Sequence, residues 1–386
     1  MIRPEYFIDT LGAHGIDFFA GVPDSLLKNN CAYISDHLDE RHNIITANEG
    51  GAVGLAAGYH LATGNIGCVY MQNSGEGNII NPLASLTDKE VYNIPVLLLI
   101  GWRGRPGVHD EPQHIKQGKV TTALLDTMGI EYAVLSKEEE EAGKQIAKAV
   151  DHMKATNEVY ALIVEKDTFE PYTLQNVRLN KLSFGREEAI QTVAASLDGK
   201  DVIVSTTGMI SRELFEYRTG KGEGHERDFL TVGSMGHASQ IALGIALEQP
   251  NRRIWCFDGD GAVIMHMGGM AIIAEKAPKN FVHVVFNNGA HDSVGGQPTV
   301  GCDIDLMELA ESLGYDVVYP GLELPLMSPE KKRLASMLEL LSWSGGHGNN
   351  LQFVEVKVAK GARKDLGRPK EPPQVNKALY MKTLAT

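Results

Sequence analysis

The chain has 386 residues, of which 43% are hydrophobic and 22% are charged, and its formal net charge at pH 7 is -13. This composition is typical of a soluble globular protein with about two domains, and the negative charge argues against nucleic acid or an anionic membrane as a partner. No apolar run reaches membrane-spanning length, the first residues lack a signal-peptide pattern, and the four cysteines have no paired spacing. We therefore expect a cytoplasmic protein with structural thiols.

The first half of the chain alternates between expected strands and expected helices. Strands are predicted at 15–20, 43–46, 67–71, 95–100 and 159–164, and a helix of small residues at 52–62. A basic loop is expected over 101–119, after the strongly apolar strand at 95–100. This alternation predicts an α/β domain over residues 1–165, built on a doubly wound parallel sheet.

A second alternating pattern occupies the remainder of the chain. Residues 166–184 have no clear period and are predicted to be a linker, and a second doubly wound parallel-sheet domain is predicted over 185–386. Its expected strands include 201–204, 253–257 and 353–356, and a helix is expected over 262–276. The tail from Lys360 contains three prolines, and we expect it to be mostly extended.

The most informative stretch begins with Gly259-Asp260-Gly261 and ends, one helix and one strand later, with Asn287-Asn288. Both loops follow strands of a parallel sheet, so they are expected at the same sheet edge, where α/β proteins bind ligands. Carboxylate and amide oxygens suit magnesium, and the free amides of a helix N-terminus suit a phosphate. The pattern therefore indicates a binding site for a diphosphate together with a metal ion.

This block resembles the cofactor fingerprint of thiamine diphosphate enzymes, which starts with Gly-Asp-Gly and ends with paired asparagines. The resemblance implies thiamine diphosphate and Mg²⁺ as cofactors, both bound around Gly259, Asp260 and Gly261. It implies three metal ligands, namely Asp260, Asn288 and the backbone carbonyl of Ala290. The gap between the two motifs is one residue longer than usual, and the alternative ligands are therefore Asn287 and the carbonyl of Gly289.

Other segments are similar to further cofactor contacts of the same family. Glu49, in Asn48-Glu49-Gly50-Gly51, matches the glutamate that hydrogen-bonds the pyrimidine ring and starts catalysis. In 231–236, Met235 matches the apolar residue that bends the cofactor, and Gly233 matches the carbonyl that accepts its amino group. Thr207 and Gly208, after the first strand of the second domain, are expected beside the diphosphate.

These motifs also bear on assembly, because Glu49 lies in the first predicted domain and Asp260 in the second. The family joins such halves across a subunit interface, so the resemblance implies a homodimer as the smallest active unit, with a tetramer as an alternative. Most members carry a middle domain, for which a linker of about twenty residues leaves no room. We therefore expect a two-domain version of the fold without a middle domain.

The loops resemble those of the phosphonopyruvate decarboxylase family, with the sulfopyruvate decarboxylases as a close relative. The resemblance rests on 21–25, 70–75, 101–104, 110–114, 295–299 and 365–369. It implies decarboxylation of a small 2-oxo acid with an anionic group on its third carbon, and expected substrate contacts from Asn73, Ser74 and Gln297. A carboligase of the acetolactate synthase type and a noncatalytic binding subunit are the alternatives.

The residue types in these loops suit an anionic substrate. Loop 101–119 has four Lys or Arg and two carboxylates, and Arg103 and Arg105 are expected to bind the phosphonate because guanidinium groups bind such anions in bidentate fashion. His114, Asp24 and Ser25 are candidates for the proton steps, with His109 as a second histidine. His291 and Asp292, just past the metal loop, are expected to line or close the site.

Overall fold

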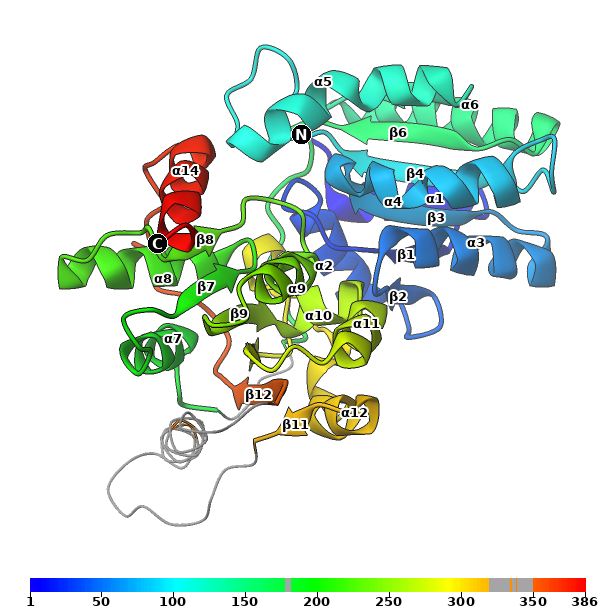
Figure 1. Ribbon diagram of the computed structural model, residues 1–386. Coiled ribbons are helices and arrows are strands. Elements are labelled where there is room, and N and C mark those ends of the chain that lie inside the picture. The colour runs from blue at the N-terminus through cyan, green and yellow to red at the C-terminus, as the bar shows by residue number, and fades with distance from the viewer. Residues whose placement is uncertain (178–181, 319–333, 335–337, 339–349) are drawn as a thin grey trace. The chain divides into compact units, whose positions relative to one another are not determined.

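The computed structural model describes residues 1–177, 182–318, 334, 338 and 350–386 (Figure 1). The chain divides into two compact units, Met1–Arg178 and Leu179–Thr386. Within the described residues each unit has one six-stranded sheet in which every pairing is parallel, with helices on both faces. The two doubly wound α/β sheets expected from the sequence are confirmed.

The sheet of the first unit has the strand order β2-β1-β3-β4-β6-β5. Its strands are β1 (Phe18–Gly21), β2 (Asn43–Ile45), β3 (Gly67–Gln72), β4 (Val96–Gly101), β5 (Glu131–Val134) and β6 (Tyr160–Val164). One face packs against α1 (Pro4–Ala13), α2 (Lys28–His37) and α6 (Glu139–Thr156). The other packs against α3 (Glu49–Thr63), α4 (Glu76–Pro82) and α5 (Pro112–Thr127). Because β4 is buried on both sides, its near-continuous apolar run is typical of a central parallel strand.

The sheet of the second unit has the order β11-β12-β10-β9-β7-β8. Its strands are β7 (Val202–Ser205), β8 (Asp228–Leu230), β9 (Ile254–Gly259), β10 (Phe281–Asn287), β11 (Asp316–Val317) and β12 (Gln352–Lys357). One face packs against α7 (Arg186–Ala195) and α8 (Met209–Lys221). The other packs against α9 (Ala238–Glu248), α10 (Asp260–Met265), α11 (Gly268–Lys276), α12 (Leu306–Leu313) and α14 (Pro373–Leu384).

The segment between the last strand of the first sheet and the first helix of the second unit follows the first unit for much of its length. Phe169 forms a bridge with Ile2 and is 3% exposed, and the hydroxyl of Tyr172 donates to Asp36 Oδ2 at 3.0 Å. Phe184 packs in the core of the second unit. Residues 178–181 of the expected linker lie outside the described residues.

The expected loop 101–119 is shorter than the sequence pattern indicated, because α5 begins at Pro112. Proline is favoured at a first helical position, where its missing N–H is not needed. Gly118 lets this helix lie against the loop, since a β-carbon there would overlap the backbone of Gly104. The indole N–H of Trp102 donates to the carbonyl of Gly118 at 2.9 Å, and this bond also holds the loop against α5.

Two further expectations about secondary structure are wrong. The helix predicted over 262–276 is broken after Met265, and His266 has the non-helical angles φ -133° and ψ 46°. The tail is not mostly extended, because α14 forms from Pro373 onward. Asn376 of this helix accepts a hydrogen bond from the backbone N–H of Leu230 at 3.2 Å, and Tyr380 is 3% exposed. The prolines before α14 set the start of a helix that covers the edge strand β8.

All four cysteines have free thiols; Cys302 is exposed and the other three are buried. Across the described part of the chain, no helix is both long enough and apolar enough to cross a membrane.

Candidate active site

Glu49 is the first residue of α3 and lies just beyond the carboxyl end of β2, where it is 5% exposed. Asn48 caps the helix by accepting a hydrogen bond from the N–H of Gly51 at 2.9 Å, which fixes the helix start. The amide of Asn78 donates to Glu49 Oε2 at 2.7 Å. A β-carbon on Gly75 would overlap the same carboxylate. The loop after β3 and the start of α4 therefore shape the position of this carboxylate.

A chain of hydrogen bonds crosses the carboxyl ends of β1, β3 and β4. Asp24, after β1, is fully buried and accepts from the amide of Gln72 at 2.6 Å and from the backbone N–H of Leu26 at 2.8 Å. The hydroxyl of Ser74 donates to Gln72 Oε1 at 2.8 Å. Ser25 Oγ accepts from Arg103 Nη1 at 2.7 Å. The structure thus brings Asp24, Ser25 and Arg103 together at one sheet edge.

Arg103 and His114 share one carboxylate, that of Asp110. Arg103 donates to it twice, from Nε at 2.8 Å and from Nη2 at 2.5 Å, and His114 Nδ1 lies 3.0 Å from Oδ1. The Arg103 and His114 hydrogen bonds outweigh the effect of burial and hold the pKa of Asp110 far below its usual range. Burial lowers the pKa of His114, opposed by its bond to Asp110. His114 is therefore neutral at pH 7, with its Nδ1 proton directed to the carboxylate.

Asn73 holds the backbone of the loop after β4 through hydrogen bonds to Arg103. It is 1% exposed; its Oδ1 accepts from the N–H of Arg103 at 3.1 Å, and its Nδ2 donates to the carbonyl of Arg103 at 2.9 Å and to Thr121 Oγ1 at 3.0 Å. Behind it, Glu76 is 3% exposed and accepts from the Thr121 hydroxyl at 3.1 Å. Burial raises the pKa of Glu76 to about 7, although the Thr121 bond acts in the opposite direction. Glu76 was not among the site residues expected from the sequence.

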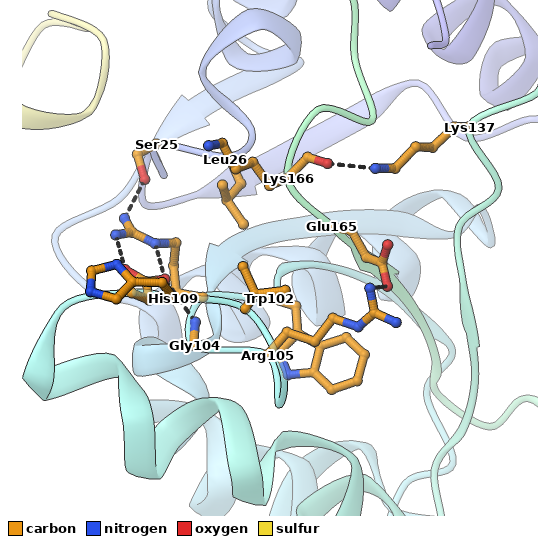
Figure 2. Close-up of a pocket in the computed structure, with 12 residues that line it drawn as sticks. Ser25, Leu26, Trp102, Gly104, Arg105, His109, Lys137, Glu165 and Lys166 are labelled. Carbon is orange, nitrogen blue, oxygen red and sulfur yellow. Dashed lines mark hydrogen bonds and ion pairs between the residues drawn. The ribbon is translucent and has the colours of Figure 1, made fainter.

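A pocket of about 480 Å³ opens beside this network in the first unit (Figure 2). Ser25, His109 and Trp102 line it, and Arg105, paired with Glu165 Oε1 at 2.7 Å, lies over the Trp102 ring. Its charged lining residues are Arg103, Arg105, Lys137, Lys166, Asp110 and Glu165. Sequence reasoning identified both arginines but neither lysine, because the lysines follow β5 and β6 rather than the basic loop.

The second unit has a smaller hollow, of about 90 Å³, at the carboxyl ends of β7, β9 and β10. Asp260, the first residue of α10, lines it and is 2% exposed. The hydroxyl of Thr299 donates to Asp260 Oδ2, and a β-carbon on Gly301 would overlap this carboxylate. Burial raises the pKa of Asp260, opposed by the Thr299 bond. Within the described residues no lysine, arginine or histidine forms an ion pair with this buried carboxylate, which suits a metal ion.

Asn287, the last residue of β10, and Asn288, which follows it, have different surroundings. Asn288 and Ala290 line the hollow, and Asn288 Nδ2 donates to Asp292 Oδ2 at 2.7 Å. Asn287 is fully buried and donates to Glu355 Oε1 at 2.7 Å and to the carbonyl of Gly301 at 2.5 Å. The geometry therefore favours the donor set of Asp260, Asn288 and Ala290 over the alternative with Asn287. All three offer oxygen atoms, as magnesium requires.

Other residues that line the cavity of about 90 Å³ suit a diphosphate. Thr206, Thr207 and Met209 line it at the N-terminus of α8, a helix of 13 residues whose free amides favour an anion. Gly208 has φ 96° and ψ -137°, a conformation that side-chain-bearing residues avoid. The Thr206 hydroxyl is buried and has no hydrogen-bond partner among the described residues. Sequence reasoning named Thr207 and Gly208 but not this neighbouring hydroxyl.

The expected pyrimidine contacts lie next to the same hollow. Met235 lines it, and its Cε lies 3.4 Å from the place where a β-carbon of Gly261 would be. The N–H of Gly233, whose φ is 77°, donates to Thr207 Oγ1 at 2.9 Å. This contact joins the loop of 231–236 to the start of α8. Residues from three separate motifs of the sequence are therefore assembled around one cavity.

A buried ion cluster that was not expected from the sequence supports the loop after β10. Arg186 is 5% exposed, and its Nε and Nη1 atoms each lie 2.9 Å from a carboxylate oxygen, of Glu213 and Asp292 respectively. Asp292 in turn accepts from Asn288. His291 lines the hollow, and burial lowers its pKa to about 4. Gln297 is fully buried, lines neither cavity, and has no partner for its amide among the described residues.

Comparison with known proteins matches one family model to each of the two units of the chain. Residues 4–130 match the model of the thiamine pyrophosphate enzyme N-terminal TPP binding domain, and residues 206–331 match that of the C-terminal TPP binding domain. Phosphonopyruvate decarboxylase of Streptomyces viridochromogenes is 33% identical over 97% of this chain and 92% of its own length. Its namesake from Streptomyces hygroscopicus is 31% identical over the same shares.

A sulfopyruvate decarboxylase of Methanosarcina acetivorans is 29% identical over 81% of this chain and 83% of its own length. The similarity to the first two relatives thus extends through both units, including the loops that carry Glu49 and Asp260. The chain belongs to the thiamine pyrophosphate enzymes, in the family of the phosphonopyruvate decarboxylases.

Proposed function

We propose that this enzyme converts 3-phosphonopyruvate and a proton into phosphonoacetaldehyde and carbon dioxide, using thiamine diphosphate and Mg²⁺, as a step in phosphonate biosynthesis. The observation that carries the proposal is a cation-rich pocket of about 480 Å³ at the same sheet edge as Glu49, in a chain 33% identical to a phosphonopyruvate decarboxylase. A phosphonate is a compact anion, and such a pocket supplies the matching charge. Sulfopyruvate is the second candidate substrate, supported by the relative that is 29% identical.

The residues of the second unit fit the cofactor and its metal. Asp260, Asn288 and the carbonyl of Ala290 would hold Mg²⁺, while Thr206 and the N-terminus of α8 would bind the diphosphate. When bound, thiamine diphosphate supplies the sink for the electrons that the departing carboxylate leaves behind. Asp292 and Arg186 would keep Asn288 in place, because Asn288 donates to Asp292 at 2.7 Å.

The residues of the first unit would bind the substrate and move protons. Glu49, held by Asn78, would hydrogen-bond the pyrimidine ring and position a proton there. His114 directs its Nδ1 proton to Asp110, so its Nε2 keeps a lone pair and can accept or relay a proton near neutral pH. Asp24 and Ser25 belong to the same hydrogen-bonded chain and would order the reacting end of the substrate.

Assembly as a homodimer follows from the family's arrangement, in which the glutamate of one subunit and the metal ligands of another form one active site. A tetramer would pair two such dimers. The helix that starts with Glu49 supports an interface. On α3, Gly51, Gly54 and Gly58 are exposed together with Leu55 (39% exposed) and Leu61 (75% exposed). Small residues permit a close helix contact, and exposed leucines gain from burial.

The Glu49→Gln variant tests the function and the role of Glu49 together. Purified wild-type protein with thiamine diphosphate and MgCl₂ should release carbon dioxide from phosphonopyruvate, and ³¹P NMR should identify phosphonoacetaldehyde. The variant should bind thiamine diphosphate in calorimetry but lose most turnover, because glutamine cannot give up or take the proton. Turnover equal to that of the wild type would exclude this role for Glu49. Acyloin in place of free aldehyde would indicate a carboligase instead.

A further inference from the structure

The pocket of about 480 Å³ in the first unit, here called the anion pocket, is lined by four cationic side chains and two carboxylates. The cations are Arg103, Arg105, Lys137 and Lys166, and the carboxylates are Asp110 and Glu165. Without counting His109, the formal charge of the lining is four minus two, or +2. How this charge is distributed decides which residues can bind an anion, because a cation already paired with a carboxylate attracts a second anion only weakly.

Both arginines are paired inside the pocket wall. Arg103 has two donors on Asp110, at 2.8 and 2.5 Å, and a third on Ser25, and the side chains of this pair are 18% and 12% exposed. Arg105 lies 2.7 Å from Glu165 and 5.8 Å from the centre of the Trp102 ring. Each guanidinium group thus has a carboxylate partner, and the Arg105 pair is the weaker one because the Arg105 side chain is 45% exposed.

The two lysines differ from the arginines in this respect. Lys137 Nζ donates to the backbone carbonyl of Lys166 at 2.7 Å, which uses one of its three N–H groups and no charge. Within the described residues, neither Lys137 nor Lys166 forms an ion pair with a carboxylate. The net positive charge of the pocket is therefore that of these two ammonium groups.

The fold places both lysines at the pocket. Lys137 follows β5 and Lys166 follows β6, and these strands are neighbours paired in register, with Val134 opposite Ile163. In Figure 2 the two lysines lie on one side of the pocket, and Trp102 and Arg105 on the other. Both lysines line the pocket, and Lys137 Nζ is directed to the carbonyl of Lys166. An anion held by the two ammonium groups would leave both arginine pairs intact.

We propose that Lys137 and Lys166 are the residues that bind the anionic group on the third carbon of the substrate and set its preferred charge, while Arg103 and Arg105 hold the pocket open. The identity of this ligand rests on the proposed function, but the binding of a tetrahedral anion by the two lysines does not. Two ammonium groups match a phosphonate dianion better than a sulfonate monoanion. The pocket should therefore prefer phosphonate.

The variants Lys137→Met and Lys166→Met remove the charge and keep an apolar chain of similar length. With the holoenzyme, we expect each variant to raise the KM for phosphonopyruvate about tenfold, the double variant about a hundredfold, and kcat to change much less. The ratio of kcat/KM for phosphonopyruvate to that for pyruvate should fall in parallel. Lys137→Arg should restore part of the loss, since it restores the charge.

Lys154→Met is the matched control, because Lys154 Nζ also donates to a backbone carbonyl of the first unit, that of His14 at 3.3 Å, and does not line the pocket. Melting curves of all variants verify folding. An unchanged KM in the double variant, or a loss equal to that of Lys154→Met, would overturn the proposal.

Calorimetry with methylphosphonate and methanesulfonate, without substrate, separates this proposal from the proposed function. Methylphosphonate binding that the double variant weakens about a hundredfold supports the two lysines even if the wild-type protein does not turn over phosphonopyruvate. Turnover of phosphonopyruvate by the wild type, combined with equal methylphosphonate affinity in wild type and double variant, would keep the function and reject the lysines. Tighter binding of methanesulfonate than of methylphosphonate would reject the preferred charge.

Discussion

Gly75 lies so close to the carboxylate of Glu49 that a β-carbon at position 75 would overlap it. Gly75→Ala should therefore displace Glu49, and a displacement of about 1 Å in an active site lowers turnover by about a hundredfold. Gly77→Ala is the control, since a β-carbon there meets nothing within 4 Å. Steady-state kinetics of both variants test whether Gly75 sets the position of the Glu49 carboxylate. Equal turnover in the two would show that the position of Glu49 does not limit the reaction.

The two half-sites lie in different units of the chain, with Glu49 in one and Asp260 in the other. If each active site combines two subunits, mixing the inactive variants Glu49→Gln and Asp260→Asn should restore activity. Random exchange would give about a quarter of the wild-type rate, because half of the dimers are mixed and each has one intact site. Mixed dimers that form, by native mass spectrometry, but remain inactive would place each site within a single chain.

Metal removal should loosen the cofactor. At a hundredfold excess over Kd, thiamine diphosphate with MgCl₂ should stabilise the wild-type protein by about 3 kcal/mol, and EDTA should reverse the shift in melting temperature. Asp260→Asn should show no such shift, because it removes the buried carboxylate of the metal site. Asp303→Asn, an exposed neighbour in the same unit, should behave as the wild type does. A full shift in Asp260→Asn would exclude Asp260 as a ligand.

Glu76 should make stability depend on pH. Its pKa is about 7 in the folded protein against 4.5 for the free side chain, because burial opposes its ionisation. The folded state therefore holds the proton more tightly, so this contribution to stability is fully present below pH 4.5 and is lost as the pH rises to about 7. The loss should total about 3 kcal/mol.

Glu76→Gln should keep this stability at high pH, since glutamine does not ionise. Urea unfolding from pH 4 to pH 8 measures the difference between the variant and the wild type, which should grow across that window. Glu90→Gln is the control, because Glu90 is exposed in the same unit. A difference that stays constant with pH would mean that Glu76 titrates at an ordinary value.

Much of the fold could be predicted from the sequence, as could the motifs that supply several residues of the candidate site. Apolar runs such as β4 and β10 are read from periodicity alone, because a parallel strand is buried on both faces. Glu49 stands in one motif, and Asp260 and Asn288 stand at the two ends of another, whose spacing leaves room for the helical segment and the strand between them. Gly208 and Gly233 were also named from the sequence, and both have a positive φ, which the sequence did not predict.

What the sequence did not reveal depends on contacts between distant segments. The structure pairs Arg103, an expected phosphonate ligand, with Asp110, and the sequence alone did not predict this ion pair. Lys137 and Lys166 reach the pocket only because β5 and β6 are neighbours. Arg186 supports the metal loop from a position 106 residues away from Asp292. Such relationships follow from the order of the strands, which composition does not contain.

We propose that this enzyme decarboxylates a 2-oxo acid with a phosphonate on its third carbon. The most direct test compares kcat/KM for phosphonopyruvate, sulfopyruvate and pyruvate, with thiamine diphosphate and MgCl₂ and with carbon dioxide and aldehyde measured together. We expect a preference for phosphonopyruvate of at least about a hundredfold over pyruvate and a smaller one over sulfopyruvate. A preference for sulfopyruvate, or release of carbon dioxide from none of the three, would contradict it.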